Sequence, residues 1–444
     1  MIVDSIRSSI AKWLYQCLHG EVANICRELE VTDFLTKEQI EQYQFRKLKR
    51  LLYYSNYVPY YRELYNAYGI QTDDIKDFSD YKKIPILTKS AIRLNQDKLI
   101  SVLKMKSKAV RTSGSTGEPI TILKDINSRN IELALVRRFE KLMGIELGDK
   151  TLSIWGGLEM STRGKIVKKI KNYLYNRELF NNYDINTNNI DRLIVNHGVN
   201  KYKYIRGYAT SLALIAQALR RKDRKFCPYS NLKAISASVE KLLSTDRQII
   251  EDVFGKILYD QYGCGEVNSI AFECPHHNGL HHSFEHSYIE VLDLKGRESD
   301  SGRLIITNLD NLVFPLIRYE NGDLINLSSQ ECSCGRKSML ISSIKGRTFD
   351  YIEGINGSVV HGGFFDDLLL ESNANVEQIQ FVQDTARSIC VRYVGGTDMS
   401  VDAMAFIESK IKGQLGSEMQ IHFRKVEFIN VEDNGKRKLV KKTL

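Results

Sequence analysis

Arg111-Thr112-Ser113-Gly114-Ser115-Thr116-Gly117-Glu118-Pro119 is the segment that decides how this chain folds and what it binds. Residues 112–117 combine four hydroxyl side chains with two glycines. Glycine allows positive φ and a close approach of the backbone to a ligand. Successive N–H groups beside hydroxyls form a cradle for an anion. We therefore predict a phosphate-binding loop here, with an ordinary Ser/Gly turn as the alternative.

The sequence on either side indicates that this loop joins two strands. Val110 precedes it, and residues 120–123 form the β-like run Ile-Thr-Ile-Leu. Ile131, Leu135 and Phe139 then recur at helical spacing, so a helix is expected to start near residue 127. The loop is not a Walker loop, because the G-x-x-x-x-G-K-[S/T] pattern is absent from it.

Length and charge narrow the class of protein. The chain has 444 residues, enough for two or three domains. Lys and Arg number 63 against 54 Asp and Glu, a net charge of +9. This moderate balance suits anionic substrates such as ATP, CoA or nucleotide-sugars. It does not form the basic stripe typical of nucleic-acid binding, so no nucleic-acid partner is predicted.

The cysteines and the apolar runs predict a cytoplasmic protein. Eight cysteines are dispersed along the chain, no signal peptide precedes them, and no apolar run reaches the length of a membrane span. An amphipathic helix is expected from Asp4 to about His19, with Ile10 and Trp13 on its apolar side. We expect this helix to pack on the main domain, and peripheral membrane contact is the alternative.

Strand and helix patterns predict an α/β fold. From residue 151 to residue 259, strand-like runs alternate with helical ones, which favours a mostly parallel sheet. Short strands after about Ser301 predict a smaller β-rich layer. An α+β module of about a hundred residues follows Arg347. The expected elements include helices over Leu212–Arg221 and Glu240–Phe254 and a strand over Glu427–Ile429.

Three further motifs carry groups suited to a nucleotide site. Tyr262-Gly263-Cys264-Gly265-Glu266 follows the predicted strand Ile257–Tyr259, and ligands of open α/β sheets bind at the carboxyl ends of strands. Arg318-Tyr319-Glu320-Asn321-Gly322-Asp323 ends in a carboxylate, with an Asn-Gly hairpin turn as the alternative. Asn434-Gly435-Lys436-Arg437-Lys438 lies near the C-terminus, where a solvated basic tail is the alternative.

Cysteines and histidines gather in two stretches between residues 274 and 334. Cys274-Pro275-His276-His277 runs on to Gly279-Leu280-His281-His282, and Cys332-Ser333-Cys334-Gly335 lies downstream. Three thiolates and one imidazole would form a closed tetrahedral Zn²⁺ site with a structural role. His276, His277, His281 and His282 compete for the fourth place, and buried thiols beside a His-rich loop are the alternative.

The loop and the later motifs, in this order, resemble the adenylate-forming superfamily of acyl-CoA synthetases and adenylation domains. The whole chain is similar to the phenylacetate–CoA ligase-like branch, which includes CapK-type proteins of capsular polysaccharide biosynthesis. The resemblance implies a large N-terminal domain for ATP and the acid (residues 1–345) and a small mobile C-terminal domain (residues 346–444). It also favours His281, in its G-L-H context, as the ligand beside Cys274, Cys332 and Cys334.

The resemblance also assigns roles to single residues. Tyr262 would lie against the adenine, Glu266 would help to hold Mg²⁺, and Asp323 would bind the ribose hydroxyls. The residues implied in nucleotide binding are Thr112, Ser113, Gly114, Ser115, Thr116, Gly117, Tyr262, Gly263, Glu266, Asp323 and Arg347. Those implied in catalysis are Lys436, Glu266 and Arg347. Phe349 stands two residues after Arg347, where the family usually has Asp.

The predicted function is ATP-dependent activation of a carboxylic acid as an acyl-adenylate, with release of pyrophosphate. The acyl group would then pass to CoA, or to an amine or hydroxyl of an amino-sugar or polysaccharide precursor. The acid pocket is expected near Tyr208, Ser236 and Ala237. The alternative is a catalytically silent, zinc-stabilised scaffold with the same fold. A homodimer is compatible with either function.

Overall fold

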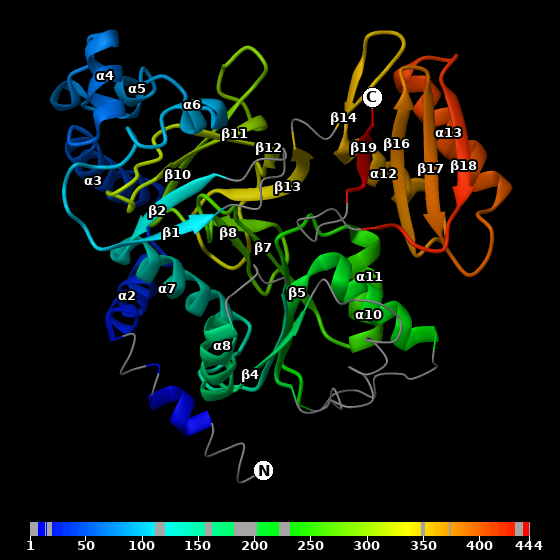
Figure 1. The fold of residues 1–444 in the computed structure, drawn as a ribbon, viewed down its shortest axis with the longest axis horizontal. Helices are drawn as coiled ribbons and strands as arrows, with labels where there is room; N and C mark the ends of the chain where they lie inside the picture. The colour runs from blue at the N-terminus through cyan, green and yellow to red at the C-terminus, as the bar shows by residue number, and fades with distance from the viewer. Residues whose placement is uncertain are drawn as a thin grey trace.

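The structure is a computed structural model, and Figure 1 shows its ribbon. It describes residues 8–13, 15, 20–111, 120–155, 162–181, 202–221, 231–347, 351–372, 374–430 and 438–443. The predicted phosphate loop (residues 112–117) and Lys436 lie outside these ranges.

One eleven-stranded sheet runs through the larger part of the molecule. Its parallel strands are, in spatial order, β4 (Arg177–Asn181), β3 (Thr151–Trp155), β5 (Tyr204–Tyr208), β6 (Ala234–Ser238) and β7 (Leu258–Tyr262). The antiparallel strands that follow are β8 (Ala271–Glu273), β9 (Leu280–His282), β13 (Leu340–Arg347), β12 (Tyr319–Leu327), β11 (Ser301–Asn308) and β10 (Ser287–Leu292). The α/β fold class is confirmed. The expected β-rich layer is not separate, however, because β7 pairs with β8 and joins the two parts into one sheet.

Helices cover both faces of the parallel strands. α10 (Ala209–Arg221) and α11 (Ser244–Phe254) pack on one face around Ile205 and Ile235. α7 (Ile126–Leu142) lies on the other face, with Phe139 against Phe272. The remaining helices of the larger part are α2 (Gly20–Thr32), α3 (Lys37–Ser55), α4 (Pro59–Tyr68), η1 (Thr72–Asp74), α5 (Phe78–Tyr81), α6 (Lys89–Leu94) and α8 (Thr162–Leu174).

The elements around the predicted phosphate loop form as expected. β1 (Ser107–Arg111) and β2 (Thr121–Asp125) are antiparallel, with Arg111 opposite Thr121, so residues 112–119 connect two paired strands. α7 begins directly after β2, and the Asp125 carboxylate caps it by accepting a hydrogen bond from the Ser128 N–H at 2.7 Å.

Some sequence-based element boundaries are wrong. α10 begins at Ala209 instead of Leu212, and α11 begins at Ser244 instead of Glu240. Both shifts involve Glu240, whose carboxylate accepts hydrogen bonds from the N–H and the hydroxyl of Thr210 at 3.2 and 2.6 Å. Glu240 therefore serves the first turn of α10, where an anion is favourable, and lies outside α11.

Two further expectations also differ from the structure. No strand covers Glu427–Ile429; the strand is β18 (Gln420–Lys425), which pairs with β17 until that pairing ends at Lys425. In the described part of the N-terminal helix, Ile10 and Trp13 are exposed, whereas Ala11 is buried. Among the residues that the structure describes, no helix has both the length and the apolar character needed to cross a membrane.

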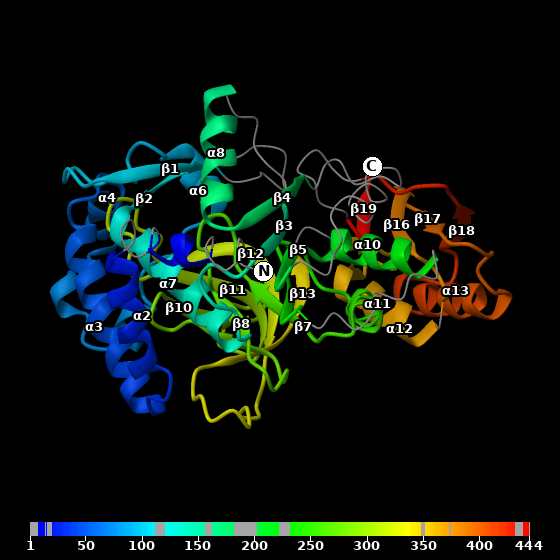
Figure 2. The ribbon, with the colours of Figure 1, turned by 90° about the horizontal axis from the view of Figure 1, so that it is seen from below.

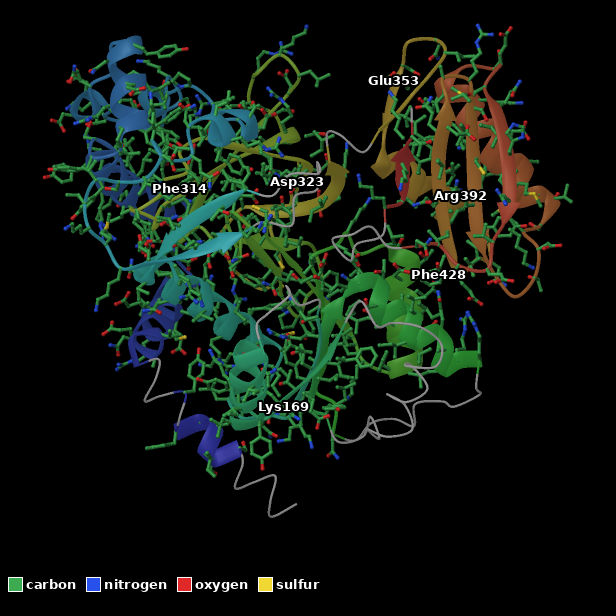
Figure 3. The ribbon with its side chains drawn as sticks, viewed as in Figure 1. Lys169, Phe314, Asp323, Glu353, Arg392 and Phe428 are labelled. Atoms are coloured by element: carbon green, nitrogen blue, oxygen red, sulfur yellow. The ribbon has the colours of Figure 1, made fainter. Side chains whose placement is uncertain are left out.

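The residues after β13 form a second α+β unit with its own core. It contains β14 (Tyr351–Glu353) paired with β15 (Val359–His361), and a four-stranded sheet of order β18-β17-β16-β19. The other elements are β16 (Gln378–Thr385), β17 (Ser388–Val394), β19 (Val440–Lys442), α12 (Gly362–Ser372) and α13 (Val401–Leu415). Phe365 and Phe381 lie in this core. Figure 3 draws the side chains of the molecule as sticks and labels Arg392 on β17 of this unit. Figures 1 and 2 place this C-terminal unit at the end of the molecule opposite α3 and α4.

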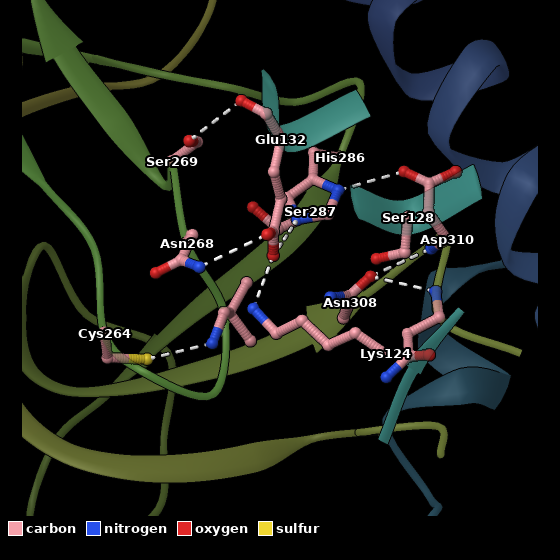
Figure 4. A network of polar contacts seen from close by, with 12 residues as sticks. Lys124, Ser128, Glu132, Cys264, Asn268, Ser269, His286, Ser287, Asn308 and Asp310 are labelled. Atoms are coloured by element: carbon pink, nitrogen blue, oxygen red, sulfur yellow. Dashed lines mark hydrogen bonds and ion pairs between the residues drawn. The ribbon is translucent and has the colours of Figure 1, made fainter. Parts of the chain in front are cut away.

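A buried chain of charges joins β2, α7 and α3, as the close view in Figure 4 shows in part. The Lys124 ammonium lies 2.5 Å from Glu132 Oε1, and His286 Nε2 lies 3.7 Å from the same oxygen. His286 Nδ1 is 3.0 Å from Asp310 Oδ2, and the Lys47 ammonium is 2.6 Å from Asp310 Oδ1. Lys124 and Glu132 also line the main cleft, so this chain of charges supports the wall of the cleft.

The charge of His286 should make stability depend on pH. Burial lowers the pKa of His286, but hydrogen bonds to Asp310 and Glu132 outweigh burial and raise that pKa above its usual 6.5. A raised folded-state pKa stabilises the protein fully below the unfolded-state pKa, and this stabilisation is lost as pH rises through the folded-state value.

We expect the free energy of unfolding of the wild type to exceed that of His286→Gln by a constant amount below about pH 6.5. This difference should shrink as the pH rises further, through the raised folded-state pKa of His286, and urea denaturation across the pH series measures it. His422→Gln, at an exposed position on β18, is the matched control and should give a flat difference. A difference for His286→Gln that grows with pH would contradict the assigned charge.

Candidate active site

The main cleft has a volume of about 1050 Å³ and opens at the carboxyl ends of β5, β6 and β7. Tyr208, Ser236 and Tyr262 contribute to one side, and Glu377 and Lys438 of the C-terminal unit contribute to the other. This is the edge where open α/β sheets bind nucleotides. Ala237, expected in the acid pocket, instead lies in the core under α10 and α11, because neighbouring strand residues face opposite sides of the sheet.

Two of the sequence motifs meet through one hydrogen-bonded cluster. Tyr262, the last residue of β7, donates its hydroxyl to Asp323 Oδ2 at 2.5 Å. Asn321 Nδ2 donates to the same Asp323 oxygen at 2.7 Å and to the Tyr262 hydroxyl at 3.0 Å. Burial, followed by the charge of Asp323, raises the pKa of Tyr262 well above its usual value, so Tyr262 remains a hydrogen-bond donor.

A bulge in β12 brings Asn321 and Asp323 to this cluster. The pairing with β11 shifts between Arg303 and Ile305, and Gly322 has a φ of +87°. Glycine adopts this conformation without strain. The Asn-Gly hairpin considered from the sequence is therefore wrong, because both residues lie inside a continuous strand.

Gly263 is needed for a different reason. A Cβ atom at this position would lie 2.9 Å from the Ser269 backbone nitrogen, closer than side chains tolerate. The segment after β7 can therefore fold back tightly, and the Cys264 N–H donates to the Val267 carbonyl at 2.9 Å. This turn carries Glu266, which is 5% exposed, into the cleft wall.

Glu266 has a cationic and a neutral neighbour. The Lys89 ammonium lies 3.5 Å from Glu266 Oε1, and the Tyr319 hydroxyl donates to the same oxygen at 3.3 Å. Lys89 stands at the start of α6 and lines the cleft, and no role of its side chain could be predicted from the sequence. Spacing along the chain offers no signal for this pair, since 177 positions separate the two residues in the numbering.

Arg318 positions the segment that carries Lys89. Its guanidinium pairs with Glu290 at 2.9 Å, and donates to the Ile84 carbonyl at 2.5 Å and to the Lys82 carbonyl. Its own carbonyl accepts from the Leu87 N–H at 2.9 Å. The arginine of the Arg318–Asp323 motif is therefore buried in the protein and fixes the chain before α6, while the end of the motif faces the cleft.

The side chains of the remaining predicted nucleotide-site residues are not described, whereas the segments next to them are. Residues 112–117 connect β1 to β2, and Val110 lines the cleft. Lys436 lies outside the described residues, whereas Lys438 lines the cleft. The Arg347 backbone is paired opposite Asp323 across β12 and β13, and the position of its side chain is not described. Phe349 also lies outside the described residues.

The four predicted metal ligands come together away from the cleft. The donor atoms of Cys274, His281, Cys332 and Cys334 all lie within 4.8 Å of one another. The Cys274 and Cys332 sulfurs are 3.6 Å apart, and Cys334 Sγ is 3.3 Å from His281 Nε2. Ser338 holds the opposite ring nitrogen of His281 at 3.3 Å, which orients Nε2 toward the thiols. This donor set fits tetrahedral Zn²⁺.

The competing histidines have other neighbours. His276 Nδ1 is 2.9 Å from the Ser333 hydroxyl, His277 Nδ1 is 3.2 Å from Glu273, and His282 Nε2 is 3.0 Å from the Ser287 hydroxyl. Of the four histidines in this stretch, His281 is the one whose ring nitrogen faces the thiols.

Comparisons with known proteins agree with this architecture. The family model described as the CapK C-terminal domain matches residues 352–443. Protein CapK of Staphylococcus aureus is 24% identical over 367 residues, which cover 81% of this chain and 80% of CapK. Phenylacetate-coenzyme A ligase of Thermus thermophilus is 25% identical over 347 residues, covering 72% of this chain and 74% of that enzyme.

Among solved structures, the crystal structure of 2-hydroxyisobutyryl-CoA ligase in the postadenylation state has a TM-score of 0.73 to this chain. The two are 17% identical, and the match covers 92% of this chain and 91% of the ligase. The fold is therefore that of the adenylate-forming CoA ligases. The chain is a homologue of CapK and of the phenylacetate–coenzyme A ligases.

Proposed function

We propose that this chain is an AMP-forming acid ligase that activates a carboxylic acid with ATP and releases pyrophosphate. The observation that carries the proposal is the cluster of Tyr262, Asn321 and Asp323 beside Glu266 and Lys89 at the edge of the cleft. The homologous phenylacetate–coenzyme A ligases support it, as does the similar 2-hydroxyisobutyryl-CoA ligase, which was solved with an acyl-AMP.

In this proposal the nucleotide lies between β7 and β12. Asp323 accepts hydrogen bonds from the ribose hydroxyls with a carboxylate that Tyr262 and Asn321 already orient. Glu266 is the carboxylate that would hold Mg²⁺, which supplies charge neutralisation on the phosphates. Lys89, whose ammonium lies 3.5 Å from Glu266 Oε1, would help to direct this carboxylate into the cleft. Residues 112–117 cradle the phosphates with their N–H groups and hydroxyls.

Adenylation makes a poor electrophile reactive. A carboxylate repels nucleophiles and has no good leaving group, and its mixed anhydride with AMP removes both obstacles. The protein contributes by orienting two anions, by stabilising the charge that develops on the α-phosphate, and by excluding water. We assign the cationic contribution to Lys436 and a further nucleotide contact to Arg347.

We expect ATP–pyrophosphate exchange with at least one acid from a panel of carboxylic acids. Lys436→Ala should lower the exchange rate about 100-fold or more with little change in the KM for ATP, because it acts on developing charge. Lys438→Ala tests the neighbouring lysine and should change the rate only a few-fold. Equal exchange by wild type and Lys436→Ala would remove this assignment. ATP binding without exchange for any acid would favour the catalytically silent scaffold.

We further propose that residues 346–444 move as a domain relative to residues 1–345. The separate core after β13 and the cleft between the two units support this division. Such a domain would take one pose for adenylation and another for transfer of the acyl group. Phe349, in place of the usual Asp, is the feature that favours the silent scaffold, because it stands at the proposed hinge.

The acceptor is either CoA or an amine or hydroxyl of a sugar. Similarity to phenylacetate–coenzyme A ligases favours CoA, and similarity to CapK, together with the CapK C-terminal domain, favours a polysaccharide precursor. Both proposals require ATP as a substrate, which agrees with the predicted cytoplasmic location. If CoA is the acceptor, CoA alone should release AMP from the acyl-adenylate complex. If a sugar is the acceptor, release should require an amino-sugar or polymer and should not respond to CoA.

We propose that Cys274, His281, Cys332 and Cys334 hold one structural Zn²⁺. The purified protein should then contain zinc at about one ion per chain, as expected for a closed four-ligand site. Cys274→Ser should lose the metal and lower the melting temperature by several degrees, because metal binding is linked to folding. Cys390→Ser, at a thiol in β17, is the control and should keep the metal. Purified protein without stoichiometric metal would refute the site.

A further inference from the structure

The face of the parallel strands that α7 covers has an apolar contact with this helix, and a polar row lies beside that contact. Ser153 of β3, Arg206 of β5 and Ser236 of β6 are paired in one row across the strands. The residues between them on the chain, such as Ile154 and Ile205, enter the apolar core on the opposite face. Ser153 accepts a hydrogen bond from Arg206 and Ser236 shares one with the Tyr204 hydroxyl, so the feature of this row that a ligand could use is the charge of Arg206.

Three arginines converge on this face with one carboxylate. Arg206 NH1 lies 4.0 Å from Glu140 Oε1, and Arg137 forms an ion pair with the second oxygen of Glu140. Arg177 begins the edge strand β4 and also lines the cleft. Arg177 forms no ion pair with any residue in the described ranges, and its buried Nε has no hydrogen-bond partner.

Neighbouring side chains hold the guanidinium of Arg206 in place, but they do not fully neutralise its positive charge. Its Nε donates to the Ser153 hydroxyl at 3.1 Å, and its guanidinium lies 5.5 Å from the centre of the Trp155 ring. The charge of Arg206, followed by burial, lowers the pKa of Arg177 to about 10. Among the described residues, three guanidinium groups against one carboxylate leave a surplus of positive charge in a sheltered position. A surplus of sheltered positive charge is unfavourable in the empty protein and is typical of a site that binds an anion.

Arg177 and Arg206 lie deeper in the cleft than the carboxylate that would react with ATP. Arg206 precedes Tyr208 by two residues on β5, and a strand rises about 3.3 Å per residue, so the two levels differ by about 7 Å. Tyr208 stands at the carboxyl end of β5, and Tyr262 stands at the carboxyl end of β7. An acid whose reacting carboxylate lies at this edge would have its far end near Arg206 and Arg177.

We propose that the acid activated by this chain carries a second oxyanion group, which Arg177 and Arg206 bind at the deep end of the cleft. The inference rests on the proposed adenylation of an acid. A guanidinium binds carboxylates and phosphates through paired N–H donors, so the class is a dicarboxylic acid or a carboxylic acid with a phosphonate or phosphate group. Arg137 is already engaged by Glu140 and contributes a more remote charge.

The test compares matched acids in the pyrophosphate exchange assay with the full chain. The pairs are butyrate with succinate, hexanoate with adipate, and butyrate with 3-phosphonopropionate. The wild type should use the better dianionic acid with a kcat/KM at least about tenfold above its monoanionic match, the scale of one charge-assisted contact. Arg177→Gln and Arg206→Gln should each remove this preference and leave the KM for ATP unchanged.

Two variants separate recognition from folding. Arg220→Gln removes a cation from the exposed end of α10, which lines the same cleft, and should keep the preference. Arg206→Lys keeps the charge but not the fork of donors, and should retain part of the preference. The dicarboxylate and phosphonate pairs show which oxyanion is preferred.

Equal kcat/KM for both members of every pair would overturn the inference while leaving the proposed function intact. Equal loss of exchange with both classes in Arg177→Gln and Arg206→Gln would assign the arginines a structural role. Failure of exchange with every acid would count against the proposed function, and thermal shift would then decide the inference. Stabilisation of the wild type but not of Arg177→Gln by succinate, adipate or 3-phosphonopropionate supports it, and no shift overturns it.

Discussion

The arrangement of the site depends on one buried ion pair, between Arg318 and Glu290. Two nitrogens of the guanidinium pair with the two carboxylate oxygens, and NH1 donates to two backbone carbonyls of the chain that precedes α6. Burying a charge pair is costly, and such full use of donors and acceptors is what makes it tolerable. The consequence reaches the cleft: Leu87 pairs with β12, Lys89 arrives beside Glu266, and the strand that follows Arg318 carries Asp323 to Tyr262.

The sequence reveals those parts of the fold that depend on local pattern. The strands on both sides of residues 112–117 and the buried face of α7 follow from apolar spacing and could be predicted. The starts of α10 and α11 could not, because Glu240 bonds to Thr210 across a loop instead of opening its own helix. In β12, the Asn-Gly pair has the composition of a hairpin turn, yet pairing with β11 and β13 keeps it in a strand. In β12, pairing with two neighbouring strands outweighs the local preference of an Asn-Gly pair for a turn.

The candidate site shows the same division. Tyr262, Glu266 and Asp323 could be selected from short motifs, each of which is weak alone, because their order along the chain matches the superfamily. Their mutual contacts could not be predicted: the Tyr262 hydroxyl binds Asp323, which ties the two motifs into one unit. The charge contacts of Lys89, Arg177 and Arg206 could not be predicted from the sequence either. Only the distances between strands reveal that these side chains face the cleft.

Charge is distributed unevenly between the two ends of the cleft. At the proposed nucleotide end, each carboxylate has a partner, since Glu266 lies beside Lys89 and Asp323 accepts from Tyr262 and Asn321. That end is preorganised before any ligand arrives. At the end beneath α7, Arg177 and Arg206 share too little negative charge among the described residues. A monoanionic acid carries its one negative charge on the group that reacts, so the positive charge of these arginines would remain uncompensated. A second oxyanion on the acid balances both ends at once, because the group that reacts and the group that is recognised are then different.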